Sequence, residues 1–333
     1  MRFSVNFLER REGDSPSIER VFRSVAANIV DDDISTRFSQ AKFGNSFLDT
    51  LGNLTLFRPE KTDIYHITGH ISFMALVLPK DKTVLTIHDL TILDLRTGIR
   101  RWLIKWLYFV LPARRARFLT AISNATRDKL ARIADIPADR VTVIENPLLV
   151  AESSGRAFNA KRPTILQIGT APNKNVDRLI EALADVPCRL RVIGPISEAQ
   201  EARLRELKID WSNETQLEDD AIERAYDEAA ILTLCSTDEG FGLPIIEAQA
   251  KSTVVITSNL SPMKEVAGSG AMLVDPKSVD SIRAGIHDVI GNSELRERLI
   301  LEGKKNIERF DPKEIAAKYF AVYERVLETR NKV

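Results

Sequence analysis

The chain has 333 residues, which predicts about two domains, and its 44% hydrophobic and 28% charged residues are ordinary for a soluble globular protein. Its 47 basic and 47 acidic residues balance to a formal net charge of zero, which argues against a general nucleic-acid binder. There is no run of 18 apolar residues and no apolar core at the N-terminus, so we expect neither a membrane span nor a signal peptide.

Segments typical of strands and of helices alternate along the chain, which predicts parallel α/β sheets. The first strand is expected over residues 2–7, followed by a polar loop at residues 9–14. Ser15 is placed to cap the next helix, with Pro16 in its first turn. The three aspartates at 31–33 match the D-x-D spacing of some metal sites, but they end a helix, so we expect a solvated turn and no metal.

Two strands with buried patterns are expected over residues 63–68 and 84–89, and the second ends in His88-Asp89. Ligands bind outside the carboxyl ends of strands in open parallel sheets. His88 is placed there to position a hydroxyl or to donate a hydrogen bond to a diphosphate. The alternative is a histidine satisfied by the backbone. We expect Asp89 to orient its neighbour or cap the next segment, and His66 to pack in the core.

Residues 96–127 contain no acidic side chain, and basic residues flank two tryptophan-containing apolar stretches. One interpretation is an interfacial helix attracted to anionic lipid headgroups. It would make a peripheral membrane contact through Arg100, Arg101, Trp102, Lys105 and Trp106. The other interpretation is a core helix with basic ends, and the sequence does not distinguish the two.

Strands at residues 118–123 and 141–147 complete the first half, with Ser123 or Asn124 capping the helix between them. The polar stretch 151–163 lacks periodicity and is the expected linker. Both cysteines, Cys188 and Cys235, fall in predicted strands further on. We expect them to be buried and reduced, as in a cytoplasmic protein.

The second half opens with a strand at residues 164–169, a loop at 170–175 and a helix from residue 176. Lys174 lies just before this helix and after the glycine-ended strand. A lysine in that position is well placed to pair with phosphate oxygens. The alternative is a solvated loop lysine.

The stretch at residues 231–248 carries the strongest signal in the chain. An apolar strand at 231–235 leads into a loop in which Gly240 and Gly242 flank Phe241, and Pro244 suits the first turn of the following helix. Free backbone N–H groups at such a helix start favour an anion. Glu239 and Glu247 can face one crevice there. The alternative is an ordinary turn with two surface glutamates.

Residues 236–248 resemble the E-x7-E signature and the EGFGLP loop of the retaining glycosyltransferases of family 4, with Glu239 and Glu247 at the two glutamate positions. Gly169 and Lys174 are similar to the Gly-x-x-x-x-Lys phosphate loop of that family, and His88 and Ser123 to its strand-end residues. The resemblance covers nearly the whole chain. It departs where many members have a Gly-Gly pair near Gly13 and where many have arginine at the position of Thr170.

This resemblance implies the GT-B architecture, in which two Rossmann-like, doubly wound α/β domains face a cleft and the C-terminal helix crosses back to the first domain. It places an acceptor domain at residues 1–155 and a nucleotide-sugar donor domain at 156–311. The last helix, at 312–333, packs back on the N-terminal domain.

The implied activity is transfer of a hexose-type sugar from a nucleotide diphosphate sugar to a glycan or lipid-linked acceptor of cell-envelope polysaccharide or lipopolysaccharide-type assembly. It proceeds with retention, without a metal or another cofactor, in the cytoplasm or peripherally at the cytoplasmic face of the membrane. His88 and Glu239 are the implied catalytic residues, and Glu247 the ribose contact. The other implied donor-binding residues are Ser123, Gly169, Lys174, Gly240, Phe241, Gly242 and Leu243.

Three other functions remain open. A nucleotide-sugar epimerase or a non-catalytic nucleotide-sugar binder would share the same fold, and the absence of arginine at Thr170 keeps the binder open. A glycoside hydrolase would use Glu239 and Glu247 as paired carboxylates. A phosphate-binding lysine and a helix N-terminus have no purpose in that reaction.

Overall fold

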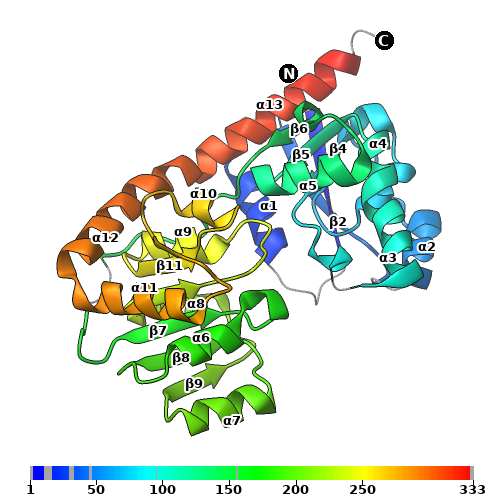
Figure 1. The fold of residues 1–333 in the computed structure, drawn as a ribbon. Helices are drawn as coiled ribbons and strands as arrows, with labels where there is room; N and C mark the ends of the chain where they lie inside the picture. The colour runs from blue at the N-terminus through cyan, green and yellow to red at the C-terminus, as the bar shows by residue number, and fades with distance from the viewer. Residues whose placement is uncertain are drawn as a thin grey trace. The chain divides into compact units, whose positions relative to one another are not determined.

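The structure is a computed structural model that describes residues 3–10, 17–29, 34–44, 47–94, 96–154 and 157–330. The chain divides into two compact units (Figure 1). The first comprises Met1–Leu149 together with Phe310–Val333, and the second comprises Val150–Arg309. The first unit is therefore built from two separate stretches of sequence, whereas the second is continuous.

A six-stranded parallel sheet forms the centre of the first unit, in the order β2-β1-β3-β4-β5-β6. Its strands are β1 Phe3–Glu9, β2 Ile34–Gln40, β3 Ile64–Ile67, β4 Thr83–Ile87, β5 Phe118–Ala121 and β6 Val141–Val143. Strands β3, β4 and β5 are buried at every position, as expected where helices cover both faces of a parallel sheet. The edge strand β2 is only partly covered.

The helices of the first unit are α1 Ser17–Ala27, α2 Phe47–Leu56, α3 Gly98–Ile104, α4 Leu111–Arg115, α5 Asn124–Ala134 and α13 Pro312–Arg330. Short 3-10 turns lie at η1 Ser72–Leu76, η2 Lys80–Lys82, η3 Thr91–Leu93 and η5 Ala138–Arg140. Between α3 and α4 the helix continues as the π-helical turn η4 Lys105–Val110. Such turns interrupt α-helices often at functional sites.

The C-terminal helix α13 belongs to the core of the first unit. Tyr323 and Tyr319 on this helix pack edge-on or tilted against His66, and the Nδ1 atom of His66 lies 2.7 Å from the hydroxyl of Tyr323. The Nε2 atom of His66 lies 2.7 Å from the hydroxyl of Thr86 in β4. His66 is therefore a core residue, as the sequence predicted. Burial lowers its pKa to about 3.

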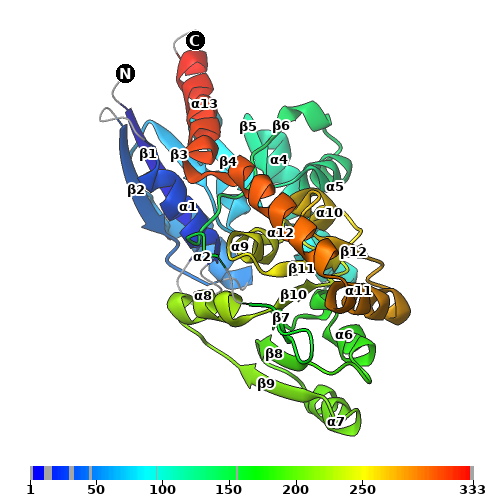
Figure 2. The ribbon, with the colours of Figure 1, turned by 90° about the vertical axis from the view of Figure 1, so that its left-hand side faces the viewer.

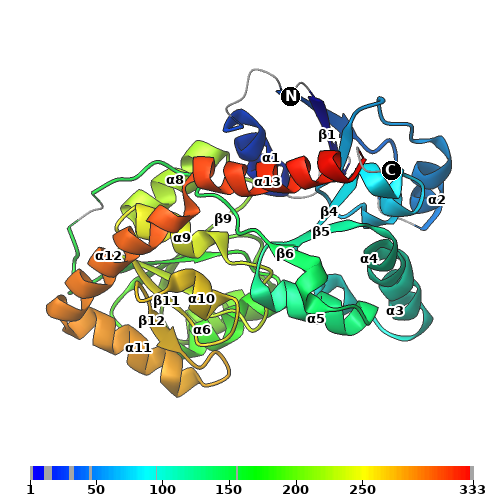
Figure 3. The ribbon, with the colours of Figure 1, turned by 90° about the horizontal axis from the view of Figure 1, so that it is seen from above.

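The second unit has another six-stranded parallel sheet, in the order β12-β11-β10-β7-β8-β9. The strands are β7 Thr164–Ile168, β8 Arg189–Ile193, β9 Asp210–Glu214, β10 Ile231–Leu234, β11 Val254–Ser258 and β12 Met272–Val274. The helices are α6 Val176–Ala182, α7 Glu198–Glu206, α8 Asp219–Glu228, α9 Leu243–Ala250, α10 Met263–Ala267, α11 Val279–Gly291 and α12 Ser293–Ile307, followed by the turn η7 Glu308–Phe310. In Figures 2 and 3 the sheet lies between α8 and α9 on one side and α6 and α11 on the other.

The predicted fold class is confirmed: both sheets are parallel and Rossmann-like, and α13 returns to the first unit. The prediction missed β2 and α2, and it placed at residues 208–210 a strand that spans Asp210–Glu214. Ser15, Pro16 and the aspartates at 31–33 lie outside the described residues. Cys188 and Cys235 are both buried, and burial raises their thiol pKa values to about 11 and about 12.

Candidate functional site

The switch point of the second sheet brings two loops together. β7 and β10 are neighbours, but the chain runs outward from β7 to β8 and β9 in one direction and from β10 to β11 and β12 in the other. Loops at the carboxyl ends of such a strand pair border one crevice, where ligands bind in open α/β sheets. The loop after β7 carries Gly169 and Lys174, and the loop after β10 carries Glu239 and Gly242.

Lys174 and Glu239 meet across these two loops. The Nζ atom of Lys174 lies 2.6 Å from Oε1 of Glu239, and the side chains are only 19% and 11% exposed. The hydroxyl of Ser236 donates a second hydrogen bond to the same oxygen, at 2.7 Å. A charge-assisted bond of this length between partly buried groups orients both side chains.

The backbones of the two loops are also tied together. The amide nitrogen of Thr237 donates to the carbonyl of Asn173 at 2.8 Å, and the Asn173 side chain donates to the carbonyl of Asp238 at 2.9 Å. Asn175, in the left-handed conformation with φ of 60°, donates to the carbonyls of Cys235 and Pro276. These bonds hold the Lys174 loop at a set distance from the Glu239 loop.

Two glycines in the site occupy conformations that other residues rarely adopt. Gly169 has φ of +81°, and a Cβ atom there would lie 3.0 Å from Cε of Lys174. The stem of Lys174 therefore passes directly over this glycine. Gly242 has φ of +104° and is the N-cap of α9, whose first two residues are Leu243 and Pro244. Between the loop and this helix, Gly240 leads into Phe241, whose side chain is buried.

Glu247 lies one turn into α9 and is buried, with 8% of its surface exposed. Its Oε2 atom accepts a hydrogen bond of 2.7 Å from the hydroxyl of Tyr226 in α8. Tyr226 is fully buried, so this bond fixes the orientation of the carboxylate.

In the first unit His88 lies at the carboxyl end of β4, and its Nε2 atom is 2.7 Å from the carbonyl oxygen of Thr68. Because a carbonyl only accepts, Nε2 donates, and Nδ1 is the acceptor nitrogen of the neutral ring. Burial, followed by the neighbouring His70, lowers the pKa of His88 to about 4. Asp89 accepts a hydrogen bond from the backbone nitrogen of Thr91 and so caps the next turn, as predicted.

Ser123 lies at the next strand end along the sheet, after β5. Its side chain is the N-cap of α5 and accepts from the backbone nitrogen of Thr126 at 3.1 Å. The hydroxyl of Thr126 in turn donates to the carbonyl of His88. Ser123 is buried and does not line the cavity that contains His88.

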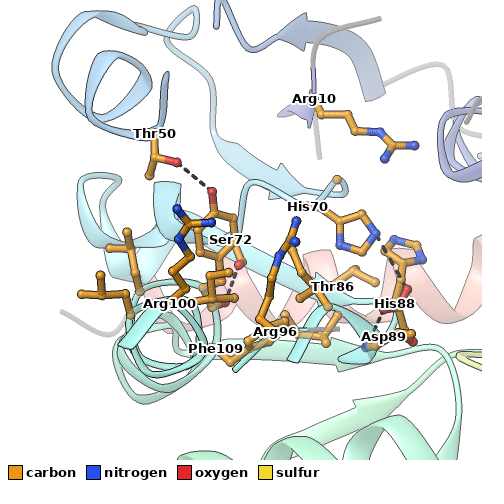
Figure 4. Close-up of a pocket in the computed structure, with 18 residues that line it drawn as sticks. Arg10, Thr50, His70, Ser72, Thr86, His88, Asp89, Arg96, Arg100 and Phe109 are labelled. Atoms are coloured by element: carbon orange, nitrogen blue, oxygen red, sulfur yellow. Dashed lines mark hydrogen bonds and ion pairs between the residues drawn. The ribbon is translucent and has the colours of Figure 1, made fainter. Parts of the chain in front are cut away.

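A cavity of about 880 Å³ opens at the strand ends of the first unit (Figure 4). All of its lining residues belong to this unit. Sequence reasoning placed His88 there but missed Arg10, His70 and Arg96. The sequence positions of Arg10 and His70 could have indicated this, because Arg10 follows β1 and His70 follows β3 just as His88 follows β4. The sequence did not reveal that these three strands are neighbours.

The residues considered for membrane contact lie on α3 and η4. Arg100, Arg101 and Trp102 are exposed, whereas Lys105 and Trp106 are half-buried. The rings of Trp102 and Trp106 lie 6.1 Å apart. Among the described residues, no helix combines the length and the apolar character needed to cross a bilayer. Nor does the described part of the chain gather three metal-binding side chains into one group.

Two family matches divide the chain at the boundary between the two structural units. Residues 3–149 match the family described as Glycosyltransferase Family 4, and residues 151–306 match the family described as Glycosyl transferases group 1. Together these two matches account for nearly the whole chain.

Two curated relatives illustrate the similarity. The O-antigen chain mannosyltransferase B of Escherichia coli is 26% identical over 258 residues, which is 69% of this chain and 67% of that protein. The MMP alpha-(1->4)-mannosyltransferase of Mycolicibacterium hassiacum is 28% identical over 250 residues, which is 69% of this chain and 59% of that protein.

Solved structures share the fold over the full length at low identity. A sucrose-phosphate synthase from Thermosynechococcus elongatus superimposes with a TM-score of 0.78 at 13% identity, covering 98% of this chain and 100% of that one. Anabaena HepE, solved in complex with UDP and glucose, has a TM-score of 0.72 at 16% identity and full coverage of both chains.

Proposed function

Because this chain belongs to the glycosyltransferases of the GT-B fold, we propose that it is a retaining, metal-independent hexosyltransferase with a nucleotide diphosphate sugar as donor. Mannose is the sugar we propose, since the relatives described above are mannosyltransferases. The acceptor is a glycan or lipid-linked glycan of cell-envelope polysaccharide or lipopolysaccharide-type assembly, and the protein works at the cytoplasmic face of the membrane.

The observation that carries this proposal is the pair of Lys174 and Glu239 at the switch point of the second sheet. A cation and a carboxylate, held 2.6 Å apart on two tied loops, suit a ligand that carries both phosphates and hydroxyl groups. In the bound state the diphosphate replaces Glu239 as the partner of Lys174. The carboxylate of Glu239 then accepts hydrogen bonds from hydroxyls of the donor sugar.

The reaction builds negative charge on the departing diphosphate. Lys174 and the backbone N–H groups of Gly242 and Leu243 at the start of α9 stabilise that charge. Preorganised donors of this kind are worth about 100- to 1000-fold in rate each. Glu247 binds the ribose with its carboxylate oriented by Tyr226. His88 offers its unprotonated Nδ1 atom to a hydroxyl near the reacting centre.

Retention follows, in this proposal, from attack by the acceptor on the same face of the sugar that the diphosphate leaves. Neither glutamate of the motif suits the role of a covalent nucleophile. In the proposed complex Glu239 is occupied by the hydroxyl of Ser236 and by hydroxyls of the donor sugar, and Glu247 is buried against Tyr226. The same engagement disfavours a hydrolase in which both carboxylates flank one glycosidic bond.

We further propose that the surface of α3 and η4 touches the membrane through Arg100, Arg101, Trp102, Lys105 and Trp106. Exposed basic residues and a tryptophan pair on one helix favour an interface rich in anionic lipid.

The test measures release of nucleoside diphosphate from guanosine, uridine and adenosine diphosphate sugars, with and without a lipid-linked glycan acceptor and in the presence of EDTA. We expect acceptor-dependent release that survives EDTA, and a product with the anomeric configuration of the donor by NMR.

Glu239→Ala should reduce turnover by at least about 100-fold with the fold intact. The exposed Glu218 provides the matched control, Glu218→Ala, which should keep wild-type turnover.

Wild-type turnover in the Glu239→Ala variant would remove this residue from the mechanism. Donor binding without acceptor-dependent release would identify a non-catalytic binder or an epimerase instead.

A further inference from the structure

The cavity of the first unit combines an apolar wall with a basic rim. The wall comes from α3, η3 and η4, and its apolar residues are Ile92, Leu103, Ile104, Leu107 and Phe109. The rim comes from three arginines, Arg10, Arg96 and Arg100. Figure 4 shows the side chains of Arg96 and Arg100 extending in the same direction from the segment at the start of α3. A volume of about 880 Å³ is large enough for a drug-sized ligand.

Carboxylates balance only part of the positive charge of this rim. Asp89 is the one carboxylate among the described lining residues, and it already caps the turn at Thr91. Arg10 pairs with Glu19 at 3.0 Å. In the part of the chain that the structure describes, no carboxylate lies within ion-pair distance of Arg96 or Arg100, whereas their neighbour Arg101 reaches Asp94 at 4.0 Å.

Exposed large apolar side chains are concentrated on the first unit, which contains the cavity. The exposed large hydrophobic residues of the described chain, apart from Leu301, are Leu48, Leu51, Leu56, Val77, Ile99, Trp102, Leu103 and Leu111. They lie on α2, at the end of η1, and on α3 and the start of α4. A hydrogen bond of 2.7 Å between the hydroxyls of Thr50 in α2 and Tyr108 in η4, both of which line the cavity, places α2 against it. Leu103 both lines the cavity and is 39% exposed, so it joins the cavity wall to the exposed apolar residues of α3.

We propose that this cavity binds the phosphate-bearing lipid of a lipid-linked glycan, which is the acceptor of the reaction. A hydroxyl oxygen of the glycan forms the new glycosidic bond as the bond between the sugar and the donor diphosphate breaks, and the hydroxyl proton leaves with the diphosphate. The apolar wall of α3 and η4 holds the part of the hydrocarbon chain next to the headgroup, and Arg96 and Arg100 bind its phosphate oxygens. Guanidinium groups suit phosphates because their paired N–H groups match two oxygens at once. The role as acceptor rests on the proposed function, whereas binding of the lipid does not.

The test uses equilibrium binding of water-soluble probes, without donor and without membranes. The probes are farnesyl diphosphate, a single-chain lysophosphatidic acid, farnesol and inorganic pyrophosphate. We expect at least one lipid phosphate to bind about tenfold or more tightly than both farnesol and pyrophosphate, because the site needs the chain and the phosphate together. The tighter of the two lipid phosphates identifies the isoprenoid or the acyl class. If neither bound more tightly than pyrophosphate, the proposal would be wrong.

Substitutions of cavity residues test whether the ligand binds in this cavity. The double replacement Arg96→Gln and Arg100→Gln should weaken lipid-phosphate binding by about tenfold or more, and Leu103→Ser should weaken it as well. The matched controls are Arg132→Gln, an exposed arginine of α5 outside the cavity, and Leu301→Ser, an exposed leucine of the second unit. Both should bind as the wild type does. Equal binding by the double variant would overturn the proposal.

Transfer assays separate this inference from the proposed function. Lipid binding that survives in a protein without any transferase activity would contradict the proposed function alone. Transfer to a water-soluble glycan with no lipid-phosphate binding would contradict the inference alone.

Discussion

At the scale of single residues, the structure separates side chains of the same type by their surroundings. Lys174 and Lys251 are both low in exposure and both ion-paired, but Lys174 lies on a strand-end loop while Lys251 follows α9 and pairs with Glu223 of α8. His66 and His88 both lie in predicted buried strands. Yet His66 is enclosed by aromatic rings, and His88 borders a cavity.

The buried histidines predict a pH dependence of stability. Burial lowers the pKa of His66 to about 3 and that of His88 to about 4, from an ordinary 6.5. Below pH 6.5 the unfolded chain therefore binds protons that the folded chain does not. The contribution of each histidine to the free energy of unfolding is fully present above pH 6.5. It falls by about 1.4 kcal/mol per pH unit as the pH drops towards 4.

Denaturant unfolding of the wild type and of His88→Gln between pH 4.5 and 7.5 measures this effect. The glutamine keeps a donor for the Thr68 carbonyl and removes one titrating ring, so the variant should lose stability less steeply on acidification. The exposed His287 provides the control, His287→Gln, which should follow the wild type. Parallel curves for the wild type and His88→Gln would show that His88 does not contribute.

At the scale of elements, the site depends on loops that follow neighbouring strands and on glycines that let those loops approach one another. Gly169 follows β7 in a conformation that L-residues rarely adopt, and it lies under the stem of Lys174. The backbone bonds between Asn173, Thr237 and Asp238 then set where Lys174 meets Glu239.

Replacing Gly169 by alanine should therefore damage the donor site. The new Cβ atom would lie 3.0 Å from Cε of Lys174, and the positive φ would cost roughly 1–2 kcal/mol of stability. We expect the affinity for nucleoside diphosphate to fall by about tenfold, measured by calorimetry. Gly291→Ala is the matched control, because no atom lies within 4 Å of its added Cβ. Unchanged affinity in Gly169→Ala would show that Lys174 tolerates displacement.

At the scale of the whole molecule, the chain builds its two units differently. The second unit is one continuous stretch, Val150–Arg309. The first takes its last helix, α13, from the other end of the sequence, and this helix supplies Tyr319 and Tyr323 to the core around His66 and Phe22.

This organisation predicts that the two units differ in their ability to fold as isolated fragments. Residues 150–309 should fold alone, unfold cooperatively and bind nucleoside diphosphate. Residues 1–149 should fail to fold cooperatively, because removing α13 exposes His66 and its aromatic neighbours to water. Circular dichroism during thermal unfolding checks both fragments, and adding α13 back through a flexible linker is the control for the second. A cooperative transition in residues 1–149 alone would contradict the assignment of α13 to that core.

Much of the fold could be predicted from the sequence, because most of its helices and strands have strong local sequence patterns. The strands β4, β7 and β10 are mainly apolar, and the helix after β10 begins with a proline in its first turn. β2 was missed because it is a partly exposed edge strand whose side chains alternate without an apolar run. The strand-end positions of His88, Lys174 and Glu239 were also readable, since each follows such a run.

Which of these positions meet was decided only by tertiary structure. The sequence placed Lys174 and Glu239 on separate loops 65 residues apart, and the pairing of β7 with β10 brought them to 2.6 Å. Arg10, His70 and Arg96 likewise line one cavity only because β1, β3 and β4 are neighbours. Local patterns specify how a segment buries its own side chains, whereas the order of strands in a sheet depends on packing between segments distant in sequence.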